Sequence, residues 1–222
     1  NERIKNEPTG LQKVMNDFWD AWTELGKEPD SLTIRGVVHE SAVAFTETVN
    51  HMYTQLDNLQ RNLNREIEEK ADEVNNILSQ IADLNMKIKK HEGTTSNISA
   101  NDYRDERNAL LDRLSCLVPI SYYENYVGEV VVSLNNRDLV NSDYFNPIIL
   151  KEDERGFGKI YWADTGDKID LKGKGELGGY IDARDIYVQK YMDDLDLLVG
   201  TIAKEVNKLH KNPLYKQYVE PV

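Results

Sequence analysis

Six residues in the last third of the chain, Gly173 to Gly178, match the G-x-G-x-x-G pattern of a dinucleotide-binding loop. The pattern follows a strand-like stretch and opens a helix, the order that a phosphate-binding turn requires. However, the neighbouring strands have an antiparallel pattern, the following helix is far too long for a βαβ unit, and Glu176 would repel a pyrophosphate. We therefore expect these glycines to give the backbone conformational freedom at the point where a sheet is joined to a helix.

The histidines and serines give no catalytic or metal-binding pattern. The four histidines are far apart in the sequence: His39, His51, His91 and His210. His39-Glu40 begins an H-E-x-x-H pattern, but Val43 occupies the position of the second histidine, so we expect no metal site. There is no G-x-S-x-G nucleophile motif. The sequence predicts neither an enzyme nor a bound cofactor.

Charged residues between Asp102 and Arg113 alternate in sign along a predicted helix. This is typical of a solvated face with ion pairs three or four residues apart, and we prefer that interpretation to a catalytic pair of carboxylates. Cys116 is the only cysteine, so no disulfide forms within this chain. Its apolar neighbours indicate a buried structural thiol.

The chain of 222 residues has a formal net charge of -12, from 27 basic and 39 acidic residues. Nucleic-acid binding requires clustered lysine and arginine that displace counterions from phosphates. The acidic balance therefore argues against nucleic acid as a partner, and equally against an anionic membrane surface. No stretch approaches about 18 consecutive apolar residues, so we expect no membrane-spanning helix.

One long segment, from about Ser31 to His91, organises the rest of the chain. It contains no proline and one glycine, Gly36. Its apolar residues recur at steps of three and four, which predicts a helix with one buried face. About 60 residues make a helix of roughly 90 Å, which needs partners along most of its length. Between Leu63 and Ala71 successive steps of four rotate the apolar face, so we expect the partner to change there.

Shorter elements are expected around this long helix. Residues 11–25 and 103–117 form helices, residues 176–210 form a second long helix, and residues 119–174 have the alternation and turns of short antiparallel strands. The predicted fold is mainly α with a small β insertion (α+β), an antiparallel bundle built on the long helix. The predicted domains are a discontinuous helical bundle (1–118 and 175–211), the β insertion (119–174) and a tail (212–222).

One aromatic cluster, Phe18, Trp19 and Trp22, lies on the apolar face of the first helix. Such a cluster is either an exposed anchor or part of the core, and we prefer the core because the rings share a face with aliphatic residues. The predicted structural core consists of Phe18, Trp19, Trp22, Leu56, Leu63, Ile67, Val74, Ile81, Ile88, Leu195 and Ile202.

Four stretches, taken in order, resemble the flagellar hook-associated protein 1 family. They are Asp17-Phe18-Trp19-Asp20-Ala21-Trp22, Ile81-Ala82-Asp83-Leu84-Asn85, Asn101-Asp102-Tyr103-Arg104-Asp105-Glu106-Arg107 and Gly175-Glu176-Leu177-Gly178-Gly179-Tyr180-Ile181-Asp182. With their flanking residues they cover about half of the chain. In such proteins the Gly-Glu-Leu-Gly-Gly stretch opens a structural helix, in agreement with our interpretation of the glycine pattern.

The resemblance implies a non-enzymatic structural subunit of the bacterial flagellum, located at the junction between hook and filament and exported without a cleaved signal peptide. It also implies the partners: hook protein, the second hook–filament junction protein, copies of the subunit in a ring, and a flagellar export chaperone. We expect this chain to be the core of such a protein without its terminal coiled-coil segments, and we expect polar residues of the β insertion to contact neighbours.

Two other hypotheses remain from the residues alone. The first is a coiled-coil adaptor or scaffold that binds partner helices along the seam of the long helix. The second is an enzyme that uses the loop of residues 173–178. A β insertion favours the flagellar subunit over the adaptor, because an adaptor bundle needs no such module.

Overall fold

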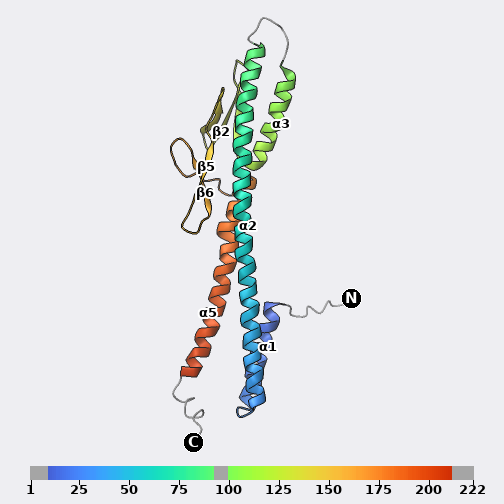
Figure 1. Cartoon of the computed structure of the whole chain (residues 1–222), viewed down its shortest axis with the longest axis vertical. Helices are drawn as coiled ribbons and strands as arrows, with labels where there is room; N and C mark the ends of the chain where they lie inside the picture. The colour runs from blue at the N-terminus through green and yellow to red at the C-terminus, as the bar shows by residue number, and fades with distance from the viewer. Residues whose placement is uncertain (1–9, 93–99, 212–222) are drawn as a thin grey trace, which may run out of the picture. The chain divides into compact units, whose positions relative to one another are not determined.

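The computed structural model describes residues 10–92 and 100–211, except for the side chain of His210. The predicted tail of residues 212–222 lies outside these ranges. The elements are α1 (Leu11–Lys27), α2 (Leu32–Glu92), α3 (Asn101–Leu117), β1 (Ile120–Glu124), β2 (Val130–Leu134), β3 (Arg137–Asn141), β4 (Tyr144–Phe145), β5 (Ile148–Glu152), β6 (Gly158–Trp162), α4 (Gly175–Asp182), the π-helix η1 (Ala183–Val188) and α5 (Gln189–Lys211). Figure 1 shows these elements, and the predicted mainly α fold with a small antiparallel β part is confirmed.

The long helix α2 has 61 residues and starts and ends within one residue of its predicted limits. The Ser31 hydroxyl accepts a hydrogen bond from the backbone N–H of Ile34 at 3.4 Å, as an N-cap residue does. The side chain of Arg35 donates to the carbonyl of Pro29 at 2.9 Å, which fixes the turn between α1 and α2.

The chain divides into two compact units at residues different from the predicted domain limits. Unit 1 consists of residues 1–58 and 190–222, and unit 2 of residues 59–189. The divisions lie inside α2 and beside the start of α5, not at the ends of the β insertion. The reason is that the second part of α2, α3 and α4 share one hydrophobic core with the strands.

Unit 2 has a large continuous core. Ile67, Val74 and Ile81 of α2 are completely buried and pack in one cluster with residues of α3 and the sheets. That cluster includes Leu111, Leu114, Val132, Leu139, Trp162 and Leu177. Ile88 is also completely buried, and Leu63 is half-buried.

Unit 1 has a much smaller core around the first part of α2. Phe45, Val49 and Leu195 are buried there, and partly buried residues of α1 and α5, including Ile202, pack against them. The ring of Phe18 is buried and stacks on Phe45 with centroids 5.9 Å apart. Thus α2 contacts α1 and α5 in unit 1 but α3 and strands in unit 2, which confirms the predicted change of partner.

Predicted burial needs correction at Trp19, Trp22, Leu56 and Cys116, and also at Leu63 and Ile202, which are only half-buried. Trp19 is 44% exposed, because it lies about 100° around α1 from the buried Phe18 and only the edge of its ring contacts that residue. Trp22 and Leu56 are half-buried. Cys116 is exposed, because it lies on the opposite side of α3 from the buried Leu114.

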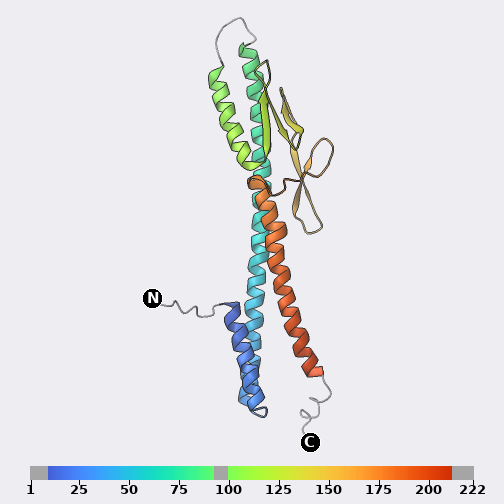
Figure 2. The same ribbon diagram turned by 180° about the vertical axis from the view of Figure 1, so that it is seen from behind.

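The strands form two antiparallel sheets, β1-β2-β3-β4 and β5-β6. Asn135 and Asn136 connect β2 to β3 with φ values of 53° and 63°, the left-handed conformation of a two-residue hairpin turn. Figure 2 shows the sheets beside the later part of α2. The second predicted long helix is interrupted by η1, which the sequence pattern did not indicate.

Candidate functional site: a clamped sheet with an exposed tyrosine edge

A buried arginine fixes the first hairpin of the large sheet to the helices. Arg107 of α3 is 1% exposed. Its guanidinium donates to the side-chain oxygen of Asn85 at 3.0 Å, to the carbonyl of Gly128 at 2.8 Å and to the carboxylate of Glu124 at 2.7 Å. Burial lowers the pKa of Arg107, and the Glu124 carboxylate opposes that change. One side chain therefore joins α2, α3, β1 and the β1–β2 turn.

Asn85 of α2 continues this cluster into the sheet. Its amide nitrogen donates to the carbonyls of Val130 and Ser142 at 2.8 and 2.9 Å, and its oxygen accepts from the backbone N–H of Val130 at 2.9 Å. The Asn85 amide is completely buried. It both donates to and accepts from the backbone of Val130, as the backbone of a neighbouring strand would. Asn85 therefore fixes the position of β2 along α2.

A second arginine joins three helices at the other end of α3. Arg113 donates to Glu73 of α2 at 2.6 Å and to Glu176 of α4 at 2.7 Å. The hydrogen bond from Arg113 is the largest of the effects that lower the pKa of Glu73 to about 2. The alternating charges of α3 are thus not only a solvated face: Arg107 is buried and Arg113 ties α3 to its neighbours.

A third arginine, Arg184, is completely buried in the π-helix η1. It donates to the carbonyl of Gly158 at 3.0 Å, to Asp185 at 2.8 Å and to the side-chain oxygen of Asn64. A π-helix leaves backbone carbonyls without their usual helical partner. Here the amide of Gln60 donates to the carbonyl of Arg184 at 3.1 Å, so α2 satisfies the irregular backbone.

The glycine pattern of residues 173–178 serves close packing. Gly175 has a φ of 71°, and a Cβ there would lie 2.4 Å from the carbonyl oxygen of Leu117. A Cβ on Gly178 would lie 2.9 Å from the backbone of Gly173. The space that a phosphate would need beside these glycines is occupied by the protein's own backbone.

Within the part of the chain that the structure describes, the clamped hairpin presents exposed tyrosines. Tyr122, Tyr123 and Tyr126 are 53%, 61% and 99% exposed. We call these three residues the β1 edge: Tyr122 and Tyr123 belong to β1, which pairs only with β2 at one end of the sheet, and Tyr126 lies in the turn that follows β1. An edge strand has unpaired backbone groups, and exposed tyrosine is enriched among the residues that dominate protein interfaces. The sequence predicts that polar residues of the β insertion contact neighbouring proteins. The large exposed side chains of that insertion include these three tyrosines.

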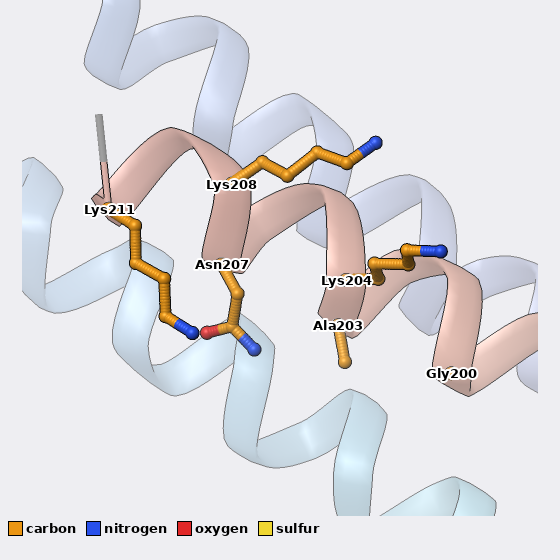
Figure 3. A pocket seen from close by; sticks show the side chains of 6 residues that line it. All are labelled: Gly200, Ala203, Lys204, Asn207, Lys208 and Lys211. Atoms are coloured by element: carbon orange, nitrogen blue, oxygen red, sulfur yellow. The ribbon is translucent and has the colours of Figure 1, made fainter.

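Unit 1 carries a separate surface feature on α5. An open depression is lined by Gly200, Ala203, Lys204, Asn207, Lys208 and Lys211 (Figure 3). Its floor consists of small side chains and its borders carry lysines. It contains no acid–base or nucleophilic pair.

Among the described residues, no three histidine, cysteine, aspartate or glutamate side chains are arranged to hold a metal ion. Over the same ranges, the helices lack a segment of the length and hydropathy needed to cross a bilayer.

Sequence reasoning missed the polar residues that organise unit 2. A signal was available, because Arg107 lies four and seven residues before Leu111 and Leu114, on the buried face of α3. Asn85 likewise falls between Ile81 and Ile88 on the buried face of α2. A polar residue on an apolar helix face predicts a buried hydrogen-bonding group.

Comparison with known proteins gives matches of three kinds: a family model, a curated relative and a solved structure. Residues 2–215 match the family model "Flagellar hook-associated protein FlgK helical domain". Flagellar hook-associated protein 1 of Bacillus subtilis (strain 168) is 28% identical, over 97% of this chain and 48% of the relative. The flagellar hook junction protein FlgK from Burkholderia pseudomallei has a similar fold, with a TM-score of 0.71, 17% identity, and coverage of 79% of this chain and 33% of that one.

The matches cover different shares of this chain and of the proteins it resembles. The chain spans about half the length of the curated relative, so it corresponds to one part of that protein. The solved structure supports the fold alone at its level of identity. The family match extends over nearly the whole chain, and it includes both units. The chain therefore belongs to the family described by the flagellar hook-associated protein FlgK helical domain.

Proposed function

We propose that this chain is part of a structural subunit at the junction between the hook and the filament of the bacterial flagellum. The observation that carries the proposal is the family match over residues 2–215, together with the hook-associated relative aligned over 97% of the chain. The subunit is exported to the flagellum and acts without catalysis. Its partners are hook protein, the second junction protein, copies of itself in a ring, and an export chaperone.

The contacts within unit 2 support a mechanical function. A junction subunit must transmit torque between two different tubes, so its sheet must not move relative to its helices. Arg107, Arg113 and Arg184 each bridge elements that are far apart in the sequence. Charge-assisted hydrogen bonds of this kind have fixed geometry and resist displacement. The β1 edge is then a rigidly held surface that fits a neighbouring protein.

Deletion of the gene, in the organism that makes this protein, tests the proposal. We expect hooks without filaments, with filament subunits released into the medium, and recovery by the full-length protein. Affinity capture from extracts of flagellated cells should recover hook protein or the second junction protein with the full-length chain. Normal filaments in the deletion strain, with a cytosolic signalling protein captured instead, would support the adaptor hypothesis.

The β1 edge has its own test. Substituting Tyr122→Ser with Tyr126→Ser should leave export unchanged but reduce incorporation into flagella, since the exposed rings are lost without disturbing the core. Tyr144→Ser, an exposed tyrosine at the opposite end of the same sheet, is the matched control. Equal incorporation of both variants would remove the β1 edge from the interface.

A further inference from the structure

Two outward faces of unit 1 have opposite charge and matching length. On α1, the exposed residues Asp17, Asp20 and Glu24 form one row at steps of three and four. On α5, the exposed residues Lys204, Lys208 and Lys211 form a second row at steps of four and three. Each row spans seven residues of helix, or about 10 Å.

Both rows point away from the core of unit 1. At about 100° per residue, Asp20 lies on the far side of α1 from the buried Phe18, and Asp17 and Glu24 lie about 100° and about 120° around the helix from it. The lysine row lies on the far side of α5 from the buried seam that contains Leu195 and the partly buried Ile202. The helices flank the first part of α2 from opposite sides in both views (Figures 1 and 2).

The lysine row also borders a surface shaped for another helix. The depression on α5 has Gly200, Ala203 and Asn207 at its floor, on the same outward side of the helix. Gly200 and Ala203 have little side-chain bulk, so a second helix can approach α5 at this point. Lys208 and Glu24 have ion pairs with Glu205 and Lys27 on their own helices, but these exposed pairs are weak and exchange readily.

We propose that the α5 depression binds the acidic face of α1 from a second copy of this chain, with the lysine row against Asp17, Asp20 and Glu24. Because the two surfaces differ, the contact between copies is heterologous, and its repetition generates a ring or a helical row of subunits. This inference rests on the proposed function, and it assigns the subunit-to-subunit surface that such a ring requires.

Carbodiimide cross-linking of isolated flagella that contain the full-length protein tests the contact directly, since the reagent joins a lysine amine to a touching carboxylate. We expect covalent dimers and higher species, with linked peptides between Lys204 or Lys208 and Asp17 or Asp20. If the protein is absent from the flagella, the proposed function fails. If it is present and the linked peptides come from other surfaces, only this inference fails.

Charge reversal supplies the second arm of the experiment. Lys204→Glu, Lys208→Glu and Lys211→Glu together, or Asp17→Lys, Asp20→Lys and Glu24→Lys together, place like charges opposite each other and should reduce dimer formation about tenfold, measured by analytical ultracentrifugation because these variants lack the amines or the carboxylates that the carbodiimide joins. Combining both triple reversals should restore it. Lys168→Glu, Lys172→Glu and Lys174→Glu, three exposed lysines of unit 2, are the matched control. Failure of the combined reversals to restore dimers, with each variant folded by circular dichroism, would overturn the proposal.

Discussion

Arg107 shows how a single residue determines the rigidity of unit 2. It is a charged side chain on the apolar face of α3, and its partners come from α2, β1 and the β1–β2 turn. Amino-acid type alone predicts that arginine is exposed, so the sequence interpretation assigned it to a solvated face. Its spacing of four and seven residues from Leu111 and Leu114 places Arg107 on the buried face of α3 and therefore predicts that it is buried. The identity of its partners could not be predicted, because they depend on contacts between distant segments.

We expect Arg107→Met to destabilise unit 2 by about 3 kcal/mol, because it removes the Arg107 donor from the Gly128 carbonyl and from the Glu124 carboxylate, and one of the two donors to the buried Asn85 oxygen. Urea unfolding followed by the fluorescence of Trp162, which lies in the unit 2 core, measures this change. Arg107→Lys should also be destabilising, since an ammonium group cannot reproduce the planar fork. Wild-type stability of the lysine variant would contradict the geometric explanation.

Glu73 gives a prediction for pH. Its pKa is lowered to about 2 by Arg113, from an ordinary value of 4.5. A lowered pKa in the folded state stabilises the protein above the ordinary value, and this contribution is lost as the pH falls from 4.5 towards 2. Since both side chains are about a third exposed, we expect a contribution of about 1 kcal/mol.

The variant Glu73→Gln should therefore lose less stability than the wild type between about pH 5 and about pH 2.5, by about 1 kcal/mol in urea unfolding. Glu106→Gln, an exposed glutamate on α3, is the control. Identical pH profiles for the wild type and Glu73→Gln would show that the ion pair contributes nothing to folding.

At the scale of elements, the periodicity of apolar residues predicts the long helix α2 but does not predict the π-helix η1. The three-four spacing of apolar residues gave α2 to within one residue, because that pattern depends on burial along one face. The turn at Asn135-Asn136 was also predictable, since asparagine readily adopts positive φ. In contrast, η1 depends on the hydrogen bond from Gln60 and on the buried Arg184, which are contacts between segments far apart in the sequence.

Two glycines at the start of α4 make a matched pair of substitutions. Gly175→Ala should destabilise the protein by about 2 kcal/mol or more, because its φ of 71° is unfavourable for alanine and the new Cβ would clash with the Leu117 carbonyl. Gly179→Ala should stabilise it by about 0.5 to 1 kcal/mol, since it lies in a helix with no atom within 4 Å of the new Cβ. Thermal unfolding measures both changes. Equal effects would contradict the assignment of Gly175 to close packing.

At the scale of the whole molecule, the two units differ in the size of their cores. The sequence predicted one discontinuous helical bundle (1–118 and 175–211) with the β insertion as a separate domain, whereas the contacts group α3 and α4 with the strands. The actual division depends on which side chains pack against α2 at each point along its length. In unit 2 the core contains residues of α2, α3, α4 and both sheets, whereas unit 1 has only a small cluster around Phe45.

We expect unit 1 to open more readily than unit 2, because it buries less apolar surface per residue. Hydrogen exchange followed by mass spectrometry should show faster exchange in residues 11–27 and 190–211 than in α3 and the second part of α2. The ranges within unit 2 act as the internal control. Uniform protection along the chain would indicate one cooperative unit and contradict the division.

The position of the protein in the flagellum tests the central claim most directly. Immunogold labelling of isolated flagella with an antibody against residues 100–189 gives this measurement by electron microscopy. We predict one band of label at the boundary between hook and filament, and none on flagella from the deletion strain. Label distributed along the filament, or absent from flagella that are otherwise complete, would contradict a junction subunit.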